Sequence, residues 1–300
     1  MAEKILAAHS GRDYVNAGEY ITARVDFVVE NDIPAFMTIK DFIELGCQKV
    51  FDKDRILIVT DHSVPNCTVE AAELNKYCRE FANKYNITHY YDVGRLGISH
   101  NIVIDKGLAG PGDLIIGTDS HTCTYGPMGA FATGSGSTDL LYAMVFGEMW
   151  MKVPETIKVV FDGKLPKWVS GKDLILYLIG QIGIEGANYK ALEFSGEAIR
   201  ELSMDSRFTI SNMTIEAGAK TGLFEIDDKA LDYCNKHCIR PYNVYQSDPD
   251  AVFEKTLHFN VSKIECQVAV PHLPENVKPI SEVEKEKVRI DQAFIGSCTN

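Results

Sequence analysis

The sequence has little that would suit a membrane or a nucleic-acid surface. Its longest apolar run, LLYAMVFG at residues 140–147, is far shorter than the ~18–20 residues that span a bilayer. Its 30 lysines and arginines are outnumbered by 42 acidic residues, which leaves a net charge of −12, whereas nucleic-acid surfaces need clustered basic side chains. The opening MAEKILAAHSG has too short an apolar run for a signal peptide. We therefore expect a cytoplasmic protein that engages neither a membrane nor nucleic acid.

The sequence also lacks the cysteine pattern of a disulfide framework. Eight cysteines are scattered through 300 residues without an export signal, which indicates reduced thiols. The nearest pair, Cys234 and Cys238 in YCNKHC, would lie on one face of a helix and could hold a metal ion. No second pair of ligands accompanies it, so two unligated thiols on a polar helix are the better interpretation.

The composition is that of a globular protein, with 45% hydrophobic and 24% charged residues. Three hundred residues correspond to about two domains with sizeable cores. A change of pattern near residues 152–154 predicts a first domain at residues 1–153 and a second at 154–270. Residues 271–300 are predicted to form a linker and the start of an incomplete third domain, in which AFIG at 293–296 reads as a buried strand.

The middle of the chain alternates between strand and helix patterns. Strand-like runs at residues 55–60, 88–93 and 113–118 are interleaved with apolar residues at helical spacing, which predict helices over 69–85 and 138–151. Strands that alternate with helices indicate parallel sheets with helices on both faces. The sequence therefore predicts an α/β fold of three-layer α/β/α units with mostly parallel sheets.

Polar side chains follow the predicted strands, where ligands gather in such sheets. Asp61 and His62 come after the run at 55–60, and a DSH tripeptide at residues 119–121 comes after the run at 113–118. His100 lies between them. A carboxylate beside an imidazole orients it and keeps it protonated, so these groups predict a proton-transfer site or a mixed His and Asp metal site. A single such histidine is more often a hydrogen-bonded turn residue, but recurrence at successive strand ends favours a site.

Five motifs in order resemble the aconitase superfamily: DHSVPN (61–66), ISHN (98–101), GTDSHTCTYG (117–126), NMTIEAGA (212–219) and GSCTN (296–300). The resemblance covers nearly the whole chain. DHSVPN and IEAGA are most similar to the large subunits of the two-subunit 3-isopropylmalate dehydratases and homoaconitases of archaea. The resemblance implies an aconitase-like fold and a hydro-lyase that isomerises a small malate-like acid by dehydration and rehydration.

The resemblance also implies a 4Fe–4S cluster, held by three cysteines, whose fourth iron is a Lewis acid for the substrate. Cys298 in GSCTN matches the first of these metal ligands. The other two belong to a later C-x-x-C in the family, and the sequence has no C-x-x-C after residue 298. We therefore expect a chain truncated at its first cluster cysteine, which binds no intact cluster and is inactive alone.

Catalytic residues carry over from the matching motifs. Asp61 and His62 match the family's DH pair, in which the imidazole protonates the departing hydroxyl group. His100 matches a histidine that the first acid of DSH, Asp119, orients. We expect residues 61–62, 100, 119–121 and 216 to converge on one cleft.

The resemblance also implies which residues surround the cluster and the substrate. Ser120 and His121 complete the DSH motif and are implied to lie beside both. Glu216 in IEAGA matches a glutamate that pairs with this second histidine, and Asn212 matches an asparagine that hydrogen-bonds the cluster or its ligands. Asn31 in ENDIPA sits where relatives place a substrate-binding amide.

Hydroxide is a poor leaving group, so such a site needs a Lewis acid and a proton donor, and the opposing step, which removes a proton beside a carboxylate, needs a base. In the family that base is a serine, which a separate small subunit supplies in two-subunit enzymes together with a loop that reads the substrate's substituent. Isopropylmalate is the favoured substrate, with citramalate as an additional candidate. The alternatives are a homoaconitase large subunit acting on homocitrate, a cluster-free scaffold that binds the small subunit, and a mononuclear-metal hydrolase built on His62, His100, Asp119 and His121.

Overall fold

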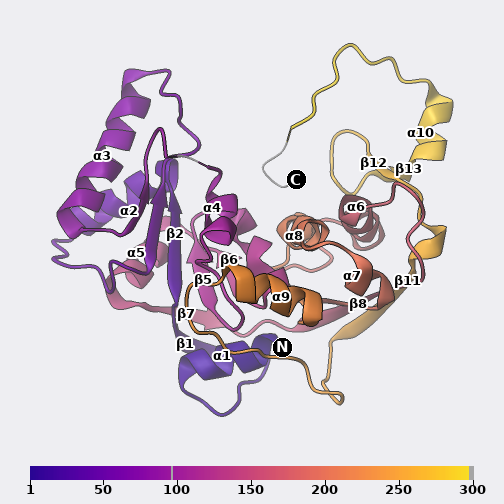
Figure 1. Ribbon diagram of the computed structural model, residues 1–300, viewed down its shortest axis with the longest axis horizontal. Coiled ribbons are helices and arrows are strands. Elements are labelled where there is room, and N and C mark those ends of the chain that lie inside the picture. Colours follow the sequence, from indigo (N-terminus) through magenta and orange to yellow (C-terminus); the bar gives the residue numbers. More distant parts are fainter. Residues whose placement is uncertain (96, 297–300) are drawn as a thin grey trace.

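The core contains two parallel β-sheets, which lie side by side (Figure 1). The computed structural model describes residues 1–95 and 97–296. The first sheet has the strand order β4-β3-β2-β5-β6, with every neighbouring pair parallel. Its strands are β2 (Phe27–Asn31), β3 (Ile56–Val59), β4 (His89–Tyr91), β5 (Leu114–Gly117) and β6 (Phe131–Gly134). The predicted strands at 55–60, 88–93 and 113–118 are confirmed as β3, β4 and β5.

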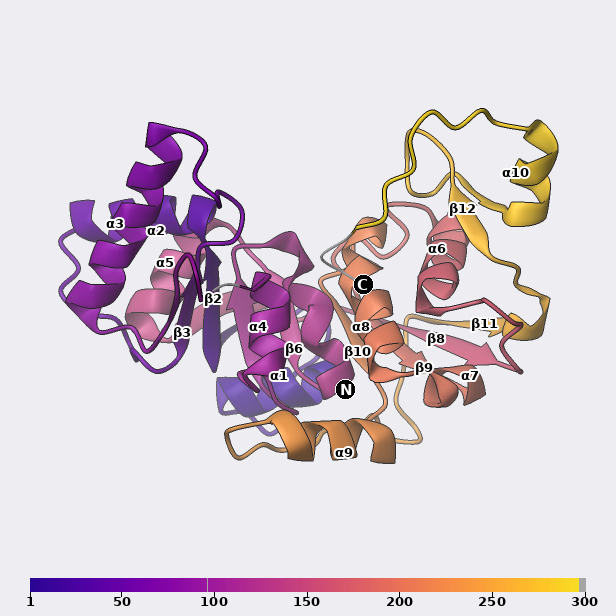
Figure 2. The ribbon, with the colours of Figure 1, turned by 45° about the horizontal axis from the view of Figure 1, so that its top comes forward.

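Helices cover both faces of the first sheet (Figure 2). Side chains alternate along β3, so that Ile56 and Ile58 enter one apolar core while Leu57 and Val59 enter the other. The first core is completed by α1 (Ala2–Ser10), α2 (Asp32–Glu44), α3 (Val69–Tyr85) and α5 (Ser137–Phe146). The second is completed by α4 (Ser99–Asp105), η1 (Ser120–Met128), α8 (Met204–Asn212) and α9 (Asp228–His237). Burial on both faces explains why β3 and β5 are apolar along their whole length.

The second sheet has the order β10-β9-β8-β11 and is also parallel throughout. Its strands are β8 (Thr156–Asp162), β9 (Ala191–Ser195), β10 (Thr221–Phe224) and β11 (Lys255–Asn260). One face packs on α6 (Gly171–Ile182), α7 (Glu197–Glu201) and α8. Lys158 and Asp162 of β8 point to the opposite face, where they line a cavity of about 750 Å³. The described fold is therefore α/β with mostly parallel sheets, as predicted.

The predicted helix at 138–151 is too long. Helix α5 ends at Phe146, because Gly147 adopts the left-handed conformation with φ 69° and stops the helix. The following residues form β7 (Glu148–Lys152), which pairs antiparallel with β1 (Tyr20–Arg24). In β7, Met149 and Met151 are buried between exposed neighbours, the period of a strand.

Helix α3 matches its predicted span of 69–85. Its N-cap is Thr68, whose side chain accepts a hydrogen bond from the Ala71 N–H group at 3.2 Å, and its C-cap is Asn86, which has φ 54°. Cys78, Phe81 and Ala82 form its buried stripe. Within the described ranges, no helix combines the length and the apolar character that crossing a bilayer requires.

The last described part of the chain contains a hairpin and a short helix. Segment 261–286 comprises η3 (Val261–Lys263), β12 (Gln267–Ala269), β13 (Val277–Pro279) and α10 (Ile280–Glu286). The expected strand at 293–296 is wrong, because those residues pair with no strand in the described part and Ile295 is 100% exposed. A strand needs a neighbour for its backbone hydrogen bonds, and an apolar run does not provide one. The division into domains at residues 153 and 270 stays a prediction.

Candidate active site

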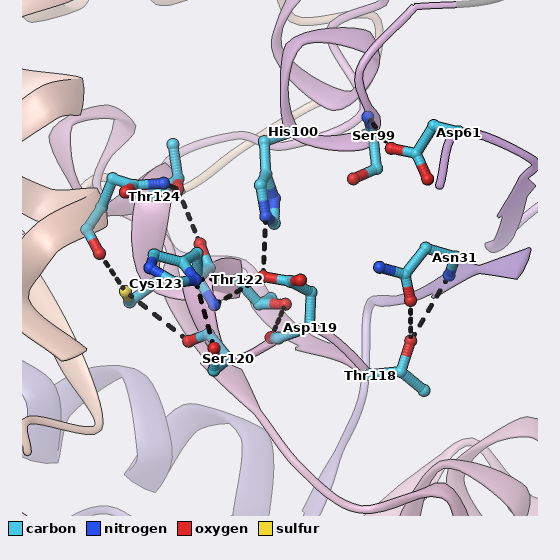
Figure 3. Close-up of polar contacts among 12 residues, drawn as sticks. Asn31, Asp61, Ser99, His100, Thr118, Asp119, Ser120, Thr122, Cys123 and Thr124 are labelled. Atoms are coloured by element: carbon cyan, nitrogen blue, oxygen red, sulfur yellow. Dashed lines mark hydrogen bonds and ion pairs between the residues drawn. The ribbon is translucent and has the colours of Figure 1, made fainter. Parts of the chain in front are cut away.

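The predicted site residues gather where the strands of the first sheet end. Asn31 is the last residue of β2, Asp61 follows β3, and Asp119 follows β5. These three strands are adjacent and parallel, so their carboxyl ends share one edge of the sheet. His100 reaches the same edge from the first turn of α4 (Figure 3).

Asp61 and His62 form a hydrogen-bonded pair. The Oδ1 atom of Asp61 lies 2.8 Å from Nδ1 of His62, and its Oδ2 atom accepts the N–H group of Ser99 at 2.7 Å (Figure 3 shows the second contact). The Asp61 side chain is nearly buried, whereas that of His62 is 46% exposed. No described residue hydrogen-bonds Nε2 of His62. The pair therefore presents one imidazole nitrogen outward while the other is held by the protein.

The surroundings of His62 favour its protonated form. Partial burial lowers its pKa, but the hydrogen bond and charge of Asp61, with the charges of Asp32 and Asp119, outweigh burial and raise the pKa overall. A protonated imidazole with an open Nε2–H group is a proton donor. Nε2 of His62 can therefore donate a proton to a ligand bound at this edge of the sheet.

His100 is enclosed, with both ring nitrogens engaged by the protein. Its Nε2 lies 3.0 Å from Oδ1 of Asp119, and its Nδ1 lies 2.9 Å from the hydroxyl of Tyr125. Burial alone would raise the pKa of Asp119, but hydrogen bonds from His100 and His121 hold it well below its usual range. Asp119 is therefore an ionised acceptor, so Nε2 of His100 carries the proton and the Tyr125 hydroxyl donates to Nδ1. His100 holds Asp119 and has no free nitrogen for a ligand.

His121 lies between two carboxylates. Its Nε2 is 3.2 Å from Oε1 of Glu216, and its Nδ1 is 3.5 Å from Oδ1 of Asp119 and 3.1 Å from Oγ of Ser120. The hydrogen bonds with Asp119 and Glu216 raise the pKa of His121 to about 9. His121 in turn holds the pKa of Glu216 below its usual value. An imidazolium at neutral pH therefore joins η1 to η2 (Met213–Ala217).

The two asparagines lie at different depths. Asn31 accepts a hydrogen bond from the Thr118 hydroxyl at 2.9 Å, and its Nδ2 lies 3.5 Å from Nδ1 of His62, so it borders the acid pair. Asn212 is 2% exposed, and its amide donates to the Thr124 hydroxyl at 2.8 Å. Asn212 therefore lies beneath η1 in the described arrangement.

Sequence reasoning missed Asp32 and Tyr125. Asp32 contacts the backbone of His62 and Ser63, and Tyr125 completes the environment of His100. Both stand inside quoted motifs, ENDIPA and GTDSHTCTYG. Their positions inside these motifs could have indicated that they lie near the site, but which groups they contact depends on the fold.

The described cysteines do not form a thiolate set at this site. Cys298, the predicted cluster ligand, lies outside the described residues. Cys123 is the described thiol nearest to Asp119 along the chain, and its Sγ contacts the Asn212 carbonyl at 3.4 Å. It is fully buried, and burial raises its pKa to about 12, so it is a poor thiolate ligand.

The described structure also does not support the alternative of a mononuclear metal site. No three of its members, His62, His100, Asp119 and His121, offer ligand atoms within 4.8 Å of one another in the described structure. Asp119 instead pairs with His100 and His121, while His62 pairs with Asp61. The arrangement is that of an acid–base site for a small ligand.

Comparison with known proteins shows the family of the chain. The aconitase family (aconitate hydratase) matches residues 3–300. Over all 300 residues, the chain is 53% identical to a protein of Caldicellulosiruptor saccharolyticus and 54% identical to one of Pyrococcus furiosus, and it spans 70% and 71% of their lengths. They are named 3-isopropylmalate dehydratase large subunit and large subunit 1. The chain belongs to the aconitase family, which confirms the resemblance seen in the motifs.

Two further similarities complete the comparison. A 3-isopropylmalate dehydratase large subunit of Moorella thermoacetica is 53% identical over 300 residues, 71% of its length. The holo-form structure of aconitase X from Thermococcus kodakaraensis aligns over 87% of this chain and 62% of its own, with a TM-score of 0.46 and 14% identity. The latter is a distant likeness.

Proposed function

We propose that this chain is the catalytic large subunit of a 3-isopropylmalate dehydratase, a hydro-lyase that interconverts 2- and 3-isopropylmalate by removing and re-adding water. The names of relatives at 53–54% identity over the whole chain support this substrate over homocitrate. The proposed chemistry rests on the geometry of His62. Its Nδ1 lies 2.8 Å from Oδ1 of Asp61, while its side chain is 46% exposed.

In this proposal His62 gives its Nε2 proton to the departing hydroxyl, which leaves as water. Asp61 keeps the ring oriented and stabilises the imidazolium before transfer. In the rehydration direction the same nitrogen takes a proton from the incoming water. The raised pKa of His62 keeps the acid form populated near neutral pH.

Asp119, His121 and Glu216 form the other side of the proposed site. Their contacts at 3.5 and 3.2 Å fix an imidazolium between two carboxylates, close to where Ser120 presents its hydroxyl. We propose that this group positions the substrate's polar end, with Asn31 beside His62 as a further contact. His100 acts through Asp119 as a positioning residue.

Aconitase-family dehydratases use a 4Fe–4S cluster, which supplies Lewis-acid activation of the substrate oxygen when bound. We propose that Cys298 is its one ligand in this sequence and that further thiolates must come from outside these 300 residues. Asn212 would support the cluster surroundings.

The relatives are named large subunits, which implies a small-subunit partner for them. We propose that such a partner gives this chain its general base and the loop that selects the substituent.

The test is turnover of isopropylmalate, citramalate and homocitrate by the anaerobically prepared, cluster-loaded large subunit with its small subunit. His62→Gln should lower kcat by about a hundredfold or more, as the loss of a general acid does. His9→Gln is the matched control, since His9 also pairs with an aspartate, Asp26 at 2.5 Å, but on α1. Preferred turnover of homocitrate would instead make the protein a homoaconitase subunit, and partner binding without turnover would make it a scaffold.

A further inference from the structure

A buried carboxylate lies directly beneath the proposed acid. Asp32, the first residue of α2, has a fully buried side chain. Its Oδ2 accepts the N–H group of Ser63 at 2.7 Å, and its Oδ1 accepts those of His62 at 3.3 Å and Ile33 at 3.1 Å. The carboxylate therefore ties the start of α2 to the turn that follows β3.

We propose that Asp32 is a positioning residue that sets the direction in which the His62 imidazole faces. This role in catalysis rests on the proposed function, whereas the contacts themselves do not. Asp32 holds the backbone of residue 62 and of residue 63, so it fixes the turn on both sides of the His62 side chain. Asp61 then fixes the ring about its remaining torsion through Nδ1.

The arrangement fits a carboxylate better than a neutral side chain. Two oxygens accept three partly buried backbone N–H groups, so each donor has a partner. The N-terminal end of α2, a 13-residue helix, also favours negative charge at this position. An amide at residue 32 would direct an NH₂ group at one of those donors and so loosen the turn.

Asp32 also contributes to the charge that His62 faces. The groups around the ring are Asp61 on its own turn, Asp32 on α2 and Asp119 after β5, and the uncharged Asn31 at the end of β2. Oδ1 of Asp32 lies 3.6 Å from Nδ1 of His62. Loss of Asp32 therefore removes one of three negative charges as well as the hold on the turn.

The test compares Asp32→Asn with Asp173→Asn. Asp173 is nearly buried in the first turn of α6, and its two oxygens accept the N–H groups of Ser170 and Gln267, both at 2.8 Å. It therefore makes the same kind of tie between a helix start and another segment, away from the site. Asp32→Ser is the second variant, because serine still accepts a hydrogen bond at a helix start if the amide variant does not fold.

Two readouts separate positioning from stability. In the cluster-loaded enzyme with its small subunit, Asp32→Asn or Asp32→Ser should lower kcat by about tenfold or more while KM changes little, since a displaced reacting group costs this much. In the 300-residue chain, NMR titration of the His62 ring, assigned with His62→Gln, should show a lower pKa in either variant. Asp173→Asn should match wild type in both.

The proposal is overturned if the Asp32 variants keep the kcat and the His62 titration of wild type, or if Asp173→Asn loses as much activity. The NMR result does not depend on turnover. A shifted titration combined with full activity of His62→Gln would therefore leave the positioning of His62 standing and reject His62 as the acid.

Discussion

Nε2 of His121 lies 3.2 Å from Oε1 of Glu216, a contact between residues 95 positions apart in the sequence. It connects η1, which lies between β5 and β6 of the first sheet, with η2, which precedes β10 of the second sheet. The proposed site is therefore built across the junction of the two sheets, and its charge balance contributes to holding that junction.

This contact predicts a pH dependence of stability. The folded pKa of His121, about 9, exceeds its ordinary 6.5, so its contribution is fully present below about pH 6.5 and is lost as the pH rises through about 9. Glu216→Gln should cost about 1–2 kcal/mol at pH 6, allowing for the partial exposure of the pair, and should flatten this decline. Urea unfolding from pH 6 to 10 measures both. Glu225→Gln, which breaks the more exposed pair with Arg200, should change little.

Asp119 is expected to be indispensable for turnover. Asp119→Asn removes the ionised acceptor of His100 and the charge beside His121, so kcat of the assembled enzyme should fall by about a hundredfold or more. Iron and sulfide per chain should not change, because Asp119 is not proposed as a cluster ligand. Asp92→Asn, which breaks an exposed pair with Arg79, should retain activity. Loss of the cluster in Asp119→Asn would show that Asp119 is a ligand.

Gly126 allows η1 to approach β10 closely. A Cβ atom at this position would lie 1.6 Å from the Gly222 carbonyl oxygen, so the backbone would have to move. Gly126→Ala should lower the free energy of unfolding by about 2–3 kcal/mol, as overpacking does. Gly136→Ala should cost less than about 1 kcal/mol, because the added methyl group would meet no atom within 4 Å and the φ of Gly136 is −73°. Equal midpoints of thermal unfolding for both variants would contradict this account of the junction.

Cluster assembly should depend on thiols other than those described. Anaerobic reconstitution with iron and sulfide should give no stable 4Fe–4S cluster on the 300-residue chain, since one thiolate cannot replace three. A longer chain carrying a C-x-x-C after residue 298 should bind one. Cys123→Ser should leave uptake by the longer chain unchanged, because this thiol is buried with a pKa of about 12. A cluster near 1:1 on the shorter chain would contradict the prediction.

Local patterns accounted for much of the fold. Helical spacing of apolar residues placed α3 at 69–85, and short strand-like runs placed β3 and β5, because these signals reside within the segments themselves. The end of α5 was misjudged because apolar residues continue past Gly147 into a strand. The run AFIG was misjudged because hydrophobicity alone does not supply a partner strand.

The sequence by itself determined which residues the proposed chemistry uses and, through the parallel α/β pattern, that strand ends bring Asp61, His62 and Asp119 to one edge. Only the tertiary structure decided which of these side chains has a nitrogen open to a ligand and which is enclosed by the protein. His100 is closed off by Tyr125, and His62 is left with an open nitrogen above Asp32. The reason is physical: a histidine's role depends on what its two nitrogens meet, and those partners come from segments that only folding brings together.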